Sequence, residues 1–319
     1  MNDLSQEIFE VAKSVVSTVE NSVKKLNFSK FNLPALSNDI AIEIISQEIE
    51  NDIKNIIKNS REQLNTPKQG ISIIDIPSPE NDNPVFNIWI GALIALIITK
   101  QLYPTRLDKN TGLPFTLYNA SAEGQKLLDK NGIKYYSPEQ ILGFHTDGIV
   151  LEDALWSPKF VSIYNMHLAY KKPGNFHWIP FALWNEFSEW NDRLSKKRFK
   201  LGITPITYKT AANDLVITSN GEFDVALMIQ TEGATIPFFN GEVSSCISDP
   251  LFNINHIKHM HESLSKNSTR ISAPIKARRL FIVNNWLGAH ARDIFEEPLT
   301  GVKYSRSFFR AMSSEIICA

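Results

Sequence analysis

Residues 141–170 carry two features on which the fold assignment depends: ILGFHTDGIVLEDALWSPKFVSIYNMHLAY. Ile141–Gly143 and Phe160–Tyr170 are β-like runs separated by turn signals, and further short runs of this kind follow as far as Ala311, among them Arg279–Asn284 and Tyr304–Ala311. Two helices, predicted over about Pro180–Ser195 and Pro250–Leu264, interrupt these runs. Many short strands at such spacing indicate a β-sandwich or jelly roll. Between the two runs lies His145-Thr-Asp147, in which a histidine and a carboxylate are two positions apart.

The segment before this region predicts helices. Asp39–Leu64 has apolar residues at helical spacing, and Val85–Thr99 is apolar throughout. The second segment is shorter than a membrane span, so we expect a buried core helix. We therefore predict one α+β domain over residues 1–319, with a helical layer over 1–66 and a β core over 70–312. The helical layer either covers that core or forms a homodimer surface.

Composition excludes several classes of protein. The 319 residues carry a formal net charge of −1, which disfavours a nucleic-acid partner, and two cysteines exclude a disulfide framework. The N-terminus lacks the basic start and apolar run of a signal peptide, so we expect a cytoplasmic protein without a membrane partner.

His145 and Asp147 are candidate metal ligands. Residues i and i+2 of a strand face the same side, so both side chains would reach one ion. A distant histidine would complete a two-histidine, one-carboxylate triad, which is diagnostic of non-haem Fe(II) oxygenases. His290 follows a predicted strand in the stretch Asn284–Phe295, and Arg306 and Arg310 then share one strand face. A buried guanidinium there would need a carboxylate partner.

These motifs resemble the Fe(II)/2-oxoglutarate oxygenases of the taurine dioxygenase and clavaminate synthase group. The resemblance implies a double-stranded β-helix (jelly-roll, cupin-like) core with N-terminal and inserted helices. It also implies Fe(II) on His145, Asp147 and His290, the cosubstrate 2-oxoglutarate on Arg306, and O2 as oxidant. Arg310 is the alternative for Arg306, and Arg292 is expected to orient the site. The family's threonine near 2-oxoglutarate is missing from Gly174–Trp178, where His177 and Trp178 are candidate replacements.

The resemblance implies hydroxylation of an amino acid or a small derivative, either free or carrier-bound. Glu242, Trp156 and Glu152 are the candidate substrate contacts. Three alternatives stay open. One is a taurine-dioxygenase-like enzyme that desaturates another small metabolite or cleaves its C–N bond. The others are a non-catalytic small-molecule-binding protein and a metal-dependent hydrolase.

Overall fold

The computed structural model describes residues 2–3, 39–77, 84–108, 112–120, 138–203, 207–209, 215–217 and 221–319. The helix predicted before residue 39 therefore lies outside the described residues. One part of the predicted N-terminal helical layer is wrong, because Asn2–Asp3 is a short strand, β1. It pairs in parallel with β2, Ile71–Asp75.

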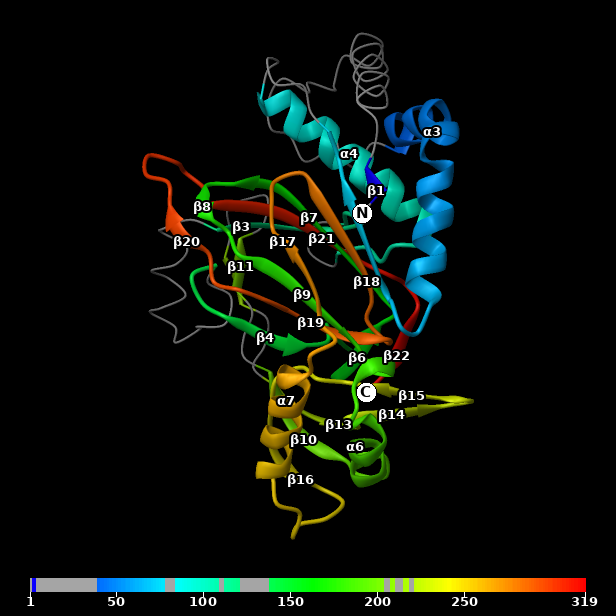
Figure 1. Ribbon diagram of the computed structural model, residues 1–319, viewed down its shortest axis with the longest axis vertical. Coiled ribbons are helices and arrows are strands. Elements are labelled where there is room, and N and C mark those ends of the chain that lie inside the picture. Colours follow the sequence, from blue (N-terminus) through cyan, green and yellow to red (C-terminus); the bar gives the residue numbers. More distant parts are fainter. Residues whose placement is uncertain are drawn as a thin grey trace.

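Two long helices form one layer of the molecule. The predicted helices are confirmed as α3 (Asp39–Asn65) and α4 (Pro84–Leu102), and both pack on one face of the largest sheet (Figure 1). Every residue of α4 from Trp89 to Thr99 is buried. A helix that is apolar all round is expected in such a position. Among the described residues, no helix is long and apolar enough to cross a membrane.

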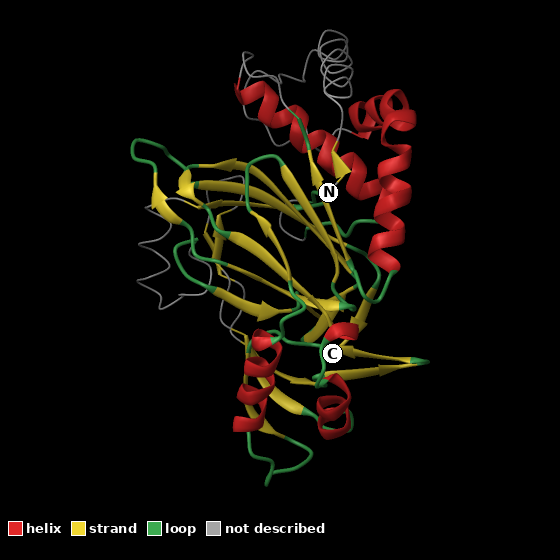
Figure 2. Cartoon of the chain, viewed as in Figure 1, coloured by secondary structure: helices red, strands yellow, loops and turns green. Residues whose placement is uncertain are grey.

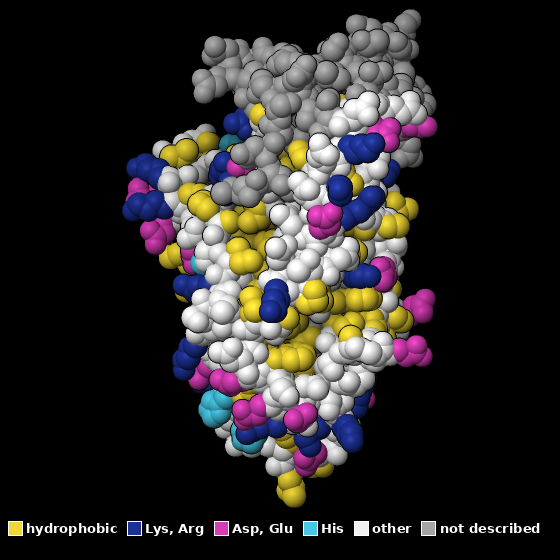
Figure 3. Space-filling model, turned by 45° about the vertical axis from the view of Figure 1, so that its right-hand side comes forward, with side chains coloured by type: hydrophobic (Ala, Val, Ile, Leu, Met, Phe, Trp, Pro, Cys, Tyr) yellow, Lys and Arg dark blue, Asp and Glu magenta, His cyan; other side chains and the backbone are white. Residues whose placement is uncertain are grey.

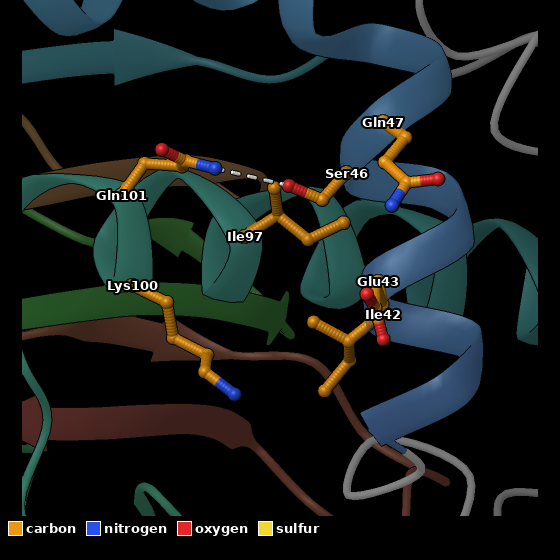
Figure 4. Close-up of a pocket in the computed structure, with 7 residues that line it drawn as sticks. All are labelled: Ile42, Glu43, Ser46, Gln47, Ile97, Lys100 and Gln101. Atoms are coloured by element: carbon orange, nitrogen blue, oxygen red, sulfur yellow. Dashed lines mark hydrogen bonds between the residues drawn. The ribbon is translucent and has the colours of Figure 1, made fainter.

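Gly91 shows how closely α4 approaches the sheet. A Cβ atom added at this position would collide with the hydroxyl of Tyr164, which is fully buried and makes no hydrogen bond to the described residues. The outer side of the helix pair is looser. There α3 and α4 line a cavity of about 400 Å³, bridged by a hydrogen bond from Gln101 to Ser46 (Figure 4).

The sheet beneath the helices has six strands. Their order is β1, β2, β18 (Arg279–Asn284), β7 (Phe160–Leu168), β21 (Arg306–Met312) and β3 (Thr116–Ala120). All neighbours after β2 are antiparallel. The predicted β run over Arg279–Asn284 is thus confirmed with its bounds, and those over Phe160–Tyr170 and Tyr304–Ala311 are confirmed with shifted ends.

A second, four-stranded antiparallel sheet lies on the other side of the apolar core. Its order is β17 (Ile271–Pro274), β9 (Asn175–Pro180), β19 (Gly288–Arg292) and β4 (Leu142–His145). Phe176 and Trp178 of β9 pack with Val161, Phe281 and Val283 of the first sheet. The fold is therefore mixed α/β, with two mostly antiparallel sheets enclosing a core (Figure 2).

The described segments 187–203 and 221–266 lie at the end of the molecule opposite α3 and α4 (Figure 1). The helix predicted over Pro180–Ser195 is only partly correct. Asn175–Pro180 is a strand, Phe181–Leu183 a 3₁₀ turn, and only Phe187–Leu194 is α-helix (α6), because buried apolar side chains of all three elements, such as Ile179, Phe181 and Trp190, pack into one core cluster. The second predicted helix is confirmed as α7, Asn255–Lys266.

Short strands complete this end and the sides of the molecule. They are β5 (Ile149–Leu151), β6 (Ala154–Pro158), β8 (Tyr170–Lys172), β10 (Phe199–Ile203), β11 (Thr207–Lys209), β12 (Leu215–Ile217), β13 (Gly221–Val225), β14 (Met228–Thr231), β15 (Ala234–Pro237), β16 (Glu242–Cys246), β20 (Glu296–Pro298) and β22 (Ile316–Cys318). The face drawn in Figure 3 carries acidic and basic side chains interspersed, rather than a continuous basic surface.

Candidate active site

The centre of the site is the pairing of β4 with β19. His145 and His290 stand directly opposite each other in this antiparallel pair, and their ring centroids are 4.3 Å apart. We expected His290 to follow a strand, but it lies inside β19. The reason is that β19 is a central strand, bonded to β4 on one side and to β9 on the other. Two residues 145 positions apart in sequence therefore become cross-strand neighbours.

Asp147 comes from the loop after β4, so the prediction that it shares the strand with His145 is wrong. The intervening Thr146 bonds instead to Phe239, accepting one hydrogen bond at its hydroxyl and donating another from its backbone N–H. The backbone N–H of Asp147 donates to Asn285 Oδ1 over 2.8 Å. These bonds turn the chain and bring the carboxylate to the two imidazoles.

The three side chains form a cluster that suits a metal ion. One ligand atom from each of His145, Asp147 and His290 lies within 4.8 Å of the others. His290 Nε2 is 3.8 Å from Asp147 Oδ2, and this oxygen is buried and has no hydrogen-bond partner in the described part of the chain. A buried carboxylate oxygen without a partner is costly. Two imidazole nitrogens and one carboxylate oxygen gathered in this way fit Fe(II) in a facial triad.

The protonation states favour metal binding. His145 Nδ1 lies 2.9 Å from the Gly143 carbonyl oxygen, so this nitrogen carries the proton and Nε2 keeps its lone pair. Burial lowers the pKa of His145, and burial together with the neighbouring His145 lowers the pKa of His290 to about 3. Both imidazoles are therefore neutral near pH 7, the form that binds a metal.

Arg310 lies against the cluster. Its Nη1 donates to Asp147 Oδ1 over 2.9 Å, and its Nη2 donates to the Tyr118 hydroxyl over 2.7 Å. Burial alone would raise the pKa of Asp147, but Arg310 and the two histidines outweigh burial and lower it. Asp147 is thus anionic, with Oδ1 held by Arg310 and Oδ2 directed to the histidines.

Arg306 occupies a different environment on the same strand face. Its side chain is buried, and its guanidinium carbon lies 4.0 Å from the ring centroid of Phe308 and 4.9 Å from that of Phe295. Its Nε and Nη2 both donate to Asn165 Oδ1. Within the described chain, no carboxylate lies within ion-pair distance of it. Burial and the neighbouring charge of Arg292 lower the pKa of Arg306 to about 9. A buried cation without a counter-ion favours an anionic ligand.

Arg292 contacts the segment that leads into β4. Its Nη1 donates to the carbonyls of Pro138, Gln140 and Asp293. This segment precedes His145, so Arg292 fixes where β4, the strand that carries His145, begins. Burial lowers the pKa of Arg292 to about 10.

The two candidate replacements for the missing threonine use their donors elsewhere. His177 bonds through Nδ1 to Ser272 and through Nε2 to Asp293, both over 2.8 Å. Trp178 donates its indole N–H to the Gln69 carbonyl. Neither side chain has a ring N–H left for a cosubstrate.

The candidate substrate contacts come from elements beside the loop after β4, which carries Asp147. Glu242 is exposed on β16, and the chain just before it meets that loop through the Thr146–Phe239 bonds. Trp156 is half-buried on β6, with an indole N–H that is buried and has no partner. Glu152 is exposed at the tight turn between β5 and β6, where its φ is 49°.

Asn285 was missed by the sequence analysis. It is fully buried, accepts from the Asp147 N–H, and donates to the Asp147 and Pro158 carbonyls and to the Ser157 hydroxyl. In the sequence, the only signal for Asn285 was its position in the stretch Asn284–Phe295, which also carries His290. Asn165 and Tyr118 were also missed, since nothing in sequence marks them as neighbours of Arg306 and Arg310.

No family model and no curated protein matches the sequence. Solved structures do match. An asparagine oxygenase in complex with Fe(II), (2S,3S)-3-hydroxyasparagine and succinate aligns with 98% of this chain and 92% of its own. The TM-score is 0.59 and the sequence identity is 12%.

The non-haem iron oxygenase OrfP in complex with Fe, succinate and (3S)-hydroxy-L-Arg aligns with 98% of this chain and 93% of its own. The TM-score is 0.61 and the identity is 12%. OrfP with Fe and α-ketoglutaric acid aligns at a TM-score of 0.59 and 10% identity. At these identities the similarity is one of fold, and the resemblance inferred from the sequence motifs is confirmed at that level: this chain has the fold of the Fe(II)/2-oxoglutarate oxygenases.

Proposed function

We propose that this chain is an Fe(II)- and 2-oxoglutarate-dependent oxygenase that hydroxylates an unactivated C–H bond of an amino acid or small amino-acid derivative. The observation that carries the proposal is the cluster of His145, Asp147 and His290, in which one Asp147 carboxylate oxygen is buried and accepts no hydrogen bond from the described residues. Fe(II) held there with 2-oxoglutarate and O2 would supply the oxidising chemistry, with succinate and CO2 as coproducts.

The protein's own residues have distinct roles in this proposal. His145 and His290 are neutral ligands and Asp147 is the anionic one. Arg306 binds the far carboxylate of 2-oxoglutarate, because it is a buried cation that has no carboxylate within ion-pair distance among the described residues. Arg310 is the alternative by sequence, but its bonds to Asp147 and Tyr118 favour a role in holding the metal ligand. Arg292 positions the start of β4.

An amino acid is the substrate class best supported. The asparagine oxygenase and OrfP were both solved with hydroxylated amino acids and succinate. Glu242 and Glu152 would provide carboxylates for a cationic end of such a substrate, and Trp156 would provide an indole N–H donor. All three lie on elements that adjoin the loop carrying Asp147. Turnover with free and with carrier-linked amino acids distinguishes the two forms of such a substrate.

We further propose that the two facing sheets form a double-stranded β-helix within a single domain. The strand orders support this, since each sheet joins strands from distant parts of the chain: β2 next to β18, and β9 between β17 and β19.

The test is anaerobic addition of Fe(II) and 2-oxoglutarate to the metal-free protein, followed in the visible region for the metal-to-ligand charge-transfer band. We expect the band in the wild type, its loss in His145→Ala and its weakening in Arg306→Ala. Arg198→Ala removes an exposed arginine that directly precedes β10, and it serves as the matched control. Absence of the band in folded wild-type protein would refute the proposal. Substrate-dependent turnover of 2-oxoglutarate over a panel of free and carrier-linked amino acids then identifies the substrate.

A further inference from the structure

Asn165 presents a buried carboxamide with only half of its hydrogen-bonding capacity used. It lies on β7, and its side chain is 1% exposed. Its Oδ1 accepts two hydrogen bonds from Arg306, over 3.2 Å from Nε and 2.8 Å from Nη2. Its Nδ2 is buried and has no hydrogen-bond partner among the described residues. The two guanidinium donors settle which end of the amide is oxygen, so Nδ2 is the unsatisfied donor.

The geometry of Arg306 shows where a ligand would sit. Asn165 takes the edge of the guanidinium formed by Nε and Nη2, and Nη1 makes no hydrogen bond to the described residues. Phe308 and Phe295 lie over the guanidinium and restrict its movement. The edge formed by Nη1 and Nη2 is thus the one left for a carboxylate, and guanidinium favours such paired contacts.

No other donor from β9 serves this position. Phe176, whose ring stacks with that of His290 at a centroid distance of 5.6 Å, offers only hydrocarbon. The ring N–H groups of His177 and Trp178 are engaged as described above. Among the described side chains of β7 and β9, the unsatisfied amide of Asn165 is a donor that lies next to Arg306.

We propose that Asn165 is the second hydrogen-bond donor for the carboxylate that Arg306 binds, and that it replaces the threonine expected from the family. The inference rests on the proposed function and names the residue that recognises the distal carboxylate of the 2-oxo diacid. Asn165 Oδ1 orients the guanidinium, and Asn165 Nδ2 donates to the carboxylate. Both groups act on the end of the cosubstrate away from the metal.

The test compares two 2-oxo acids that chelate the metal alike but differ at the far end. Fe(II)-loaded protein is titrated anaerobically with 2-oxoglutarate and with 2-oxobutyrate, which lacks the distal carboxylate, and the charge-transfer band reports both affinities. For Asn165→Leu we expect the affinity for 2-oxoglutarate to fall about tenfold or more, as for loss of a hydrogen bond to a charged group. The affinity for 2-oxobutyrate should stay within twofold of wild type.

A second variant covers the case in which Asn165→Leu does not fold. Asn165→Asp places a carboxylate on the free guanidinium, so it should keep or raise the thermal stability of the ligand-free protein while weakening 2-oxoglutarate binding more than Asn165→Leu does. Ser162→Ala is the matched control, because Ser162 lies on the same strand but bonds to Tyr103 and Thr99 on the side of the helices.

The outcomes separate the two proposals. A wild-type band with unchanged 2-oxoglutarate affinity in both Asn165 variants would overturn this inference and leave the proposed function standing. Equal losses for the two 2-oxo acids would also overturn it, because the effect would then lie at the metal. Absence of the band in the wild type would overturn the proposed function and this inference with it.

Discussion

Acid should destabilise the metal-free protein through His290. The ordinary pKa of 6.5 for histidine falls to about 3 in the folded state, because the ring is buried and lies beside His145. Between these two values the unfolded chain takes up a proton that the folded chain does not, so the free energy of unfolding decreases as the pH falls. The contribution of His290 is complete above pH 6.5 and is lost progressively toward pH 3.

The magnitude follows from the size of the shift. Each pH unit within the window corresponds to about 1.4 kcal/mol, so the change from pH 6.5 to pH 5 amounts to about 2 kcal/mol. The measurement is urea unfolding at pH 7.5 and pH 5.0 in the presence of a chelator. It compares the wild type with His290→Phe, a variant whose ring would still pack against Phe176.

The wild type should lose about 2 kcal/mol more than His290→Phe between the two pH values. Other titrating groups, including His145 and Asp147, remain in both proteins, so the difference between the two proteins reports His290. His259→Phe, which replaces an exposed histidine on α7, is the matched control and should follow the wild type. Equal losses in wild type and His290→Phe would refute the reasoning that the site holds a neutral imidazole.

Three further predictions concern the supports of the site and of the fold. Arg310→Leu leaves the buried Asp147 carboxylate without its cation and should cost about 3–5 kcal/mol of unfolding free energy by urea titration; a loss below 1 kcal/mol would contradict the pairing. Asn285→Leu removes the bonds that hold the Asp147 backbone and should weaken Mn(II) binding about 10- to 100-fold, followed by EPR, whereas unchanged affinity would show that it does not position the ligand. Gly91→Ala should destabilise by about 1–3 kcal/mol because its Cβ meets the Tyr164 hydroxyl. Adding Tyr164→Phe should restore most of that loss, and additivity of the two changes would exclude the contact.

Much of the fold and the donor set was predictable from sequence. Local periodicity identified α3 and α4, because a helix that packs on a sheet repeats its apolar residues every three or four positions. The β runs near 160–170 and 279–284 were equally local signals. The sequence made the three candidate metal ligands recognisable: His145, Asp147 and His290. Few residue types bind metal ions, and the stretches around these three residues are unusual.

Only the tertiary structure decided how those residues meet. The pairing of β4 with β19 places His145 opposite His290. The hydrogen bonds of Thr146 with Phe239 and of Asp147 with Asn285 bend the chain away from the strand. Arg306 and Arg310 are alike in sequence, yet one lies against Asn165 between two aromatic rings and the other against Asp147. Register, cross-strand partners and burial arise from contacts between segments more than one hundred residues apart, and no local pattern of side chains encodes them.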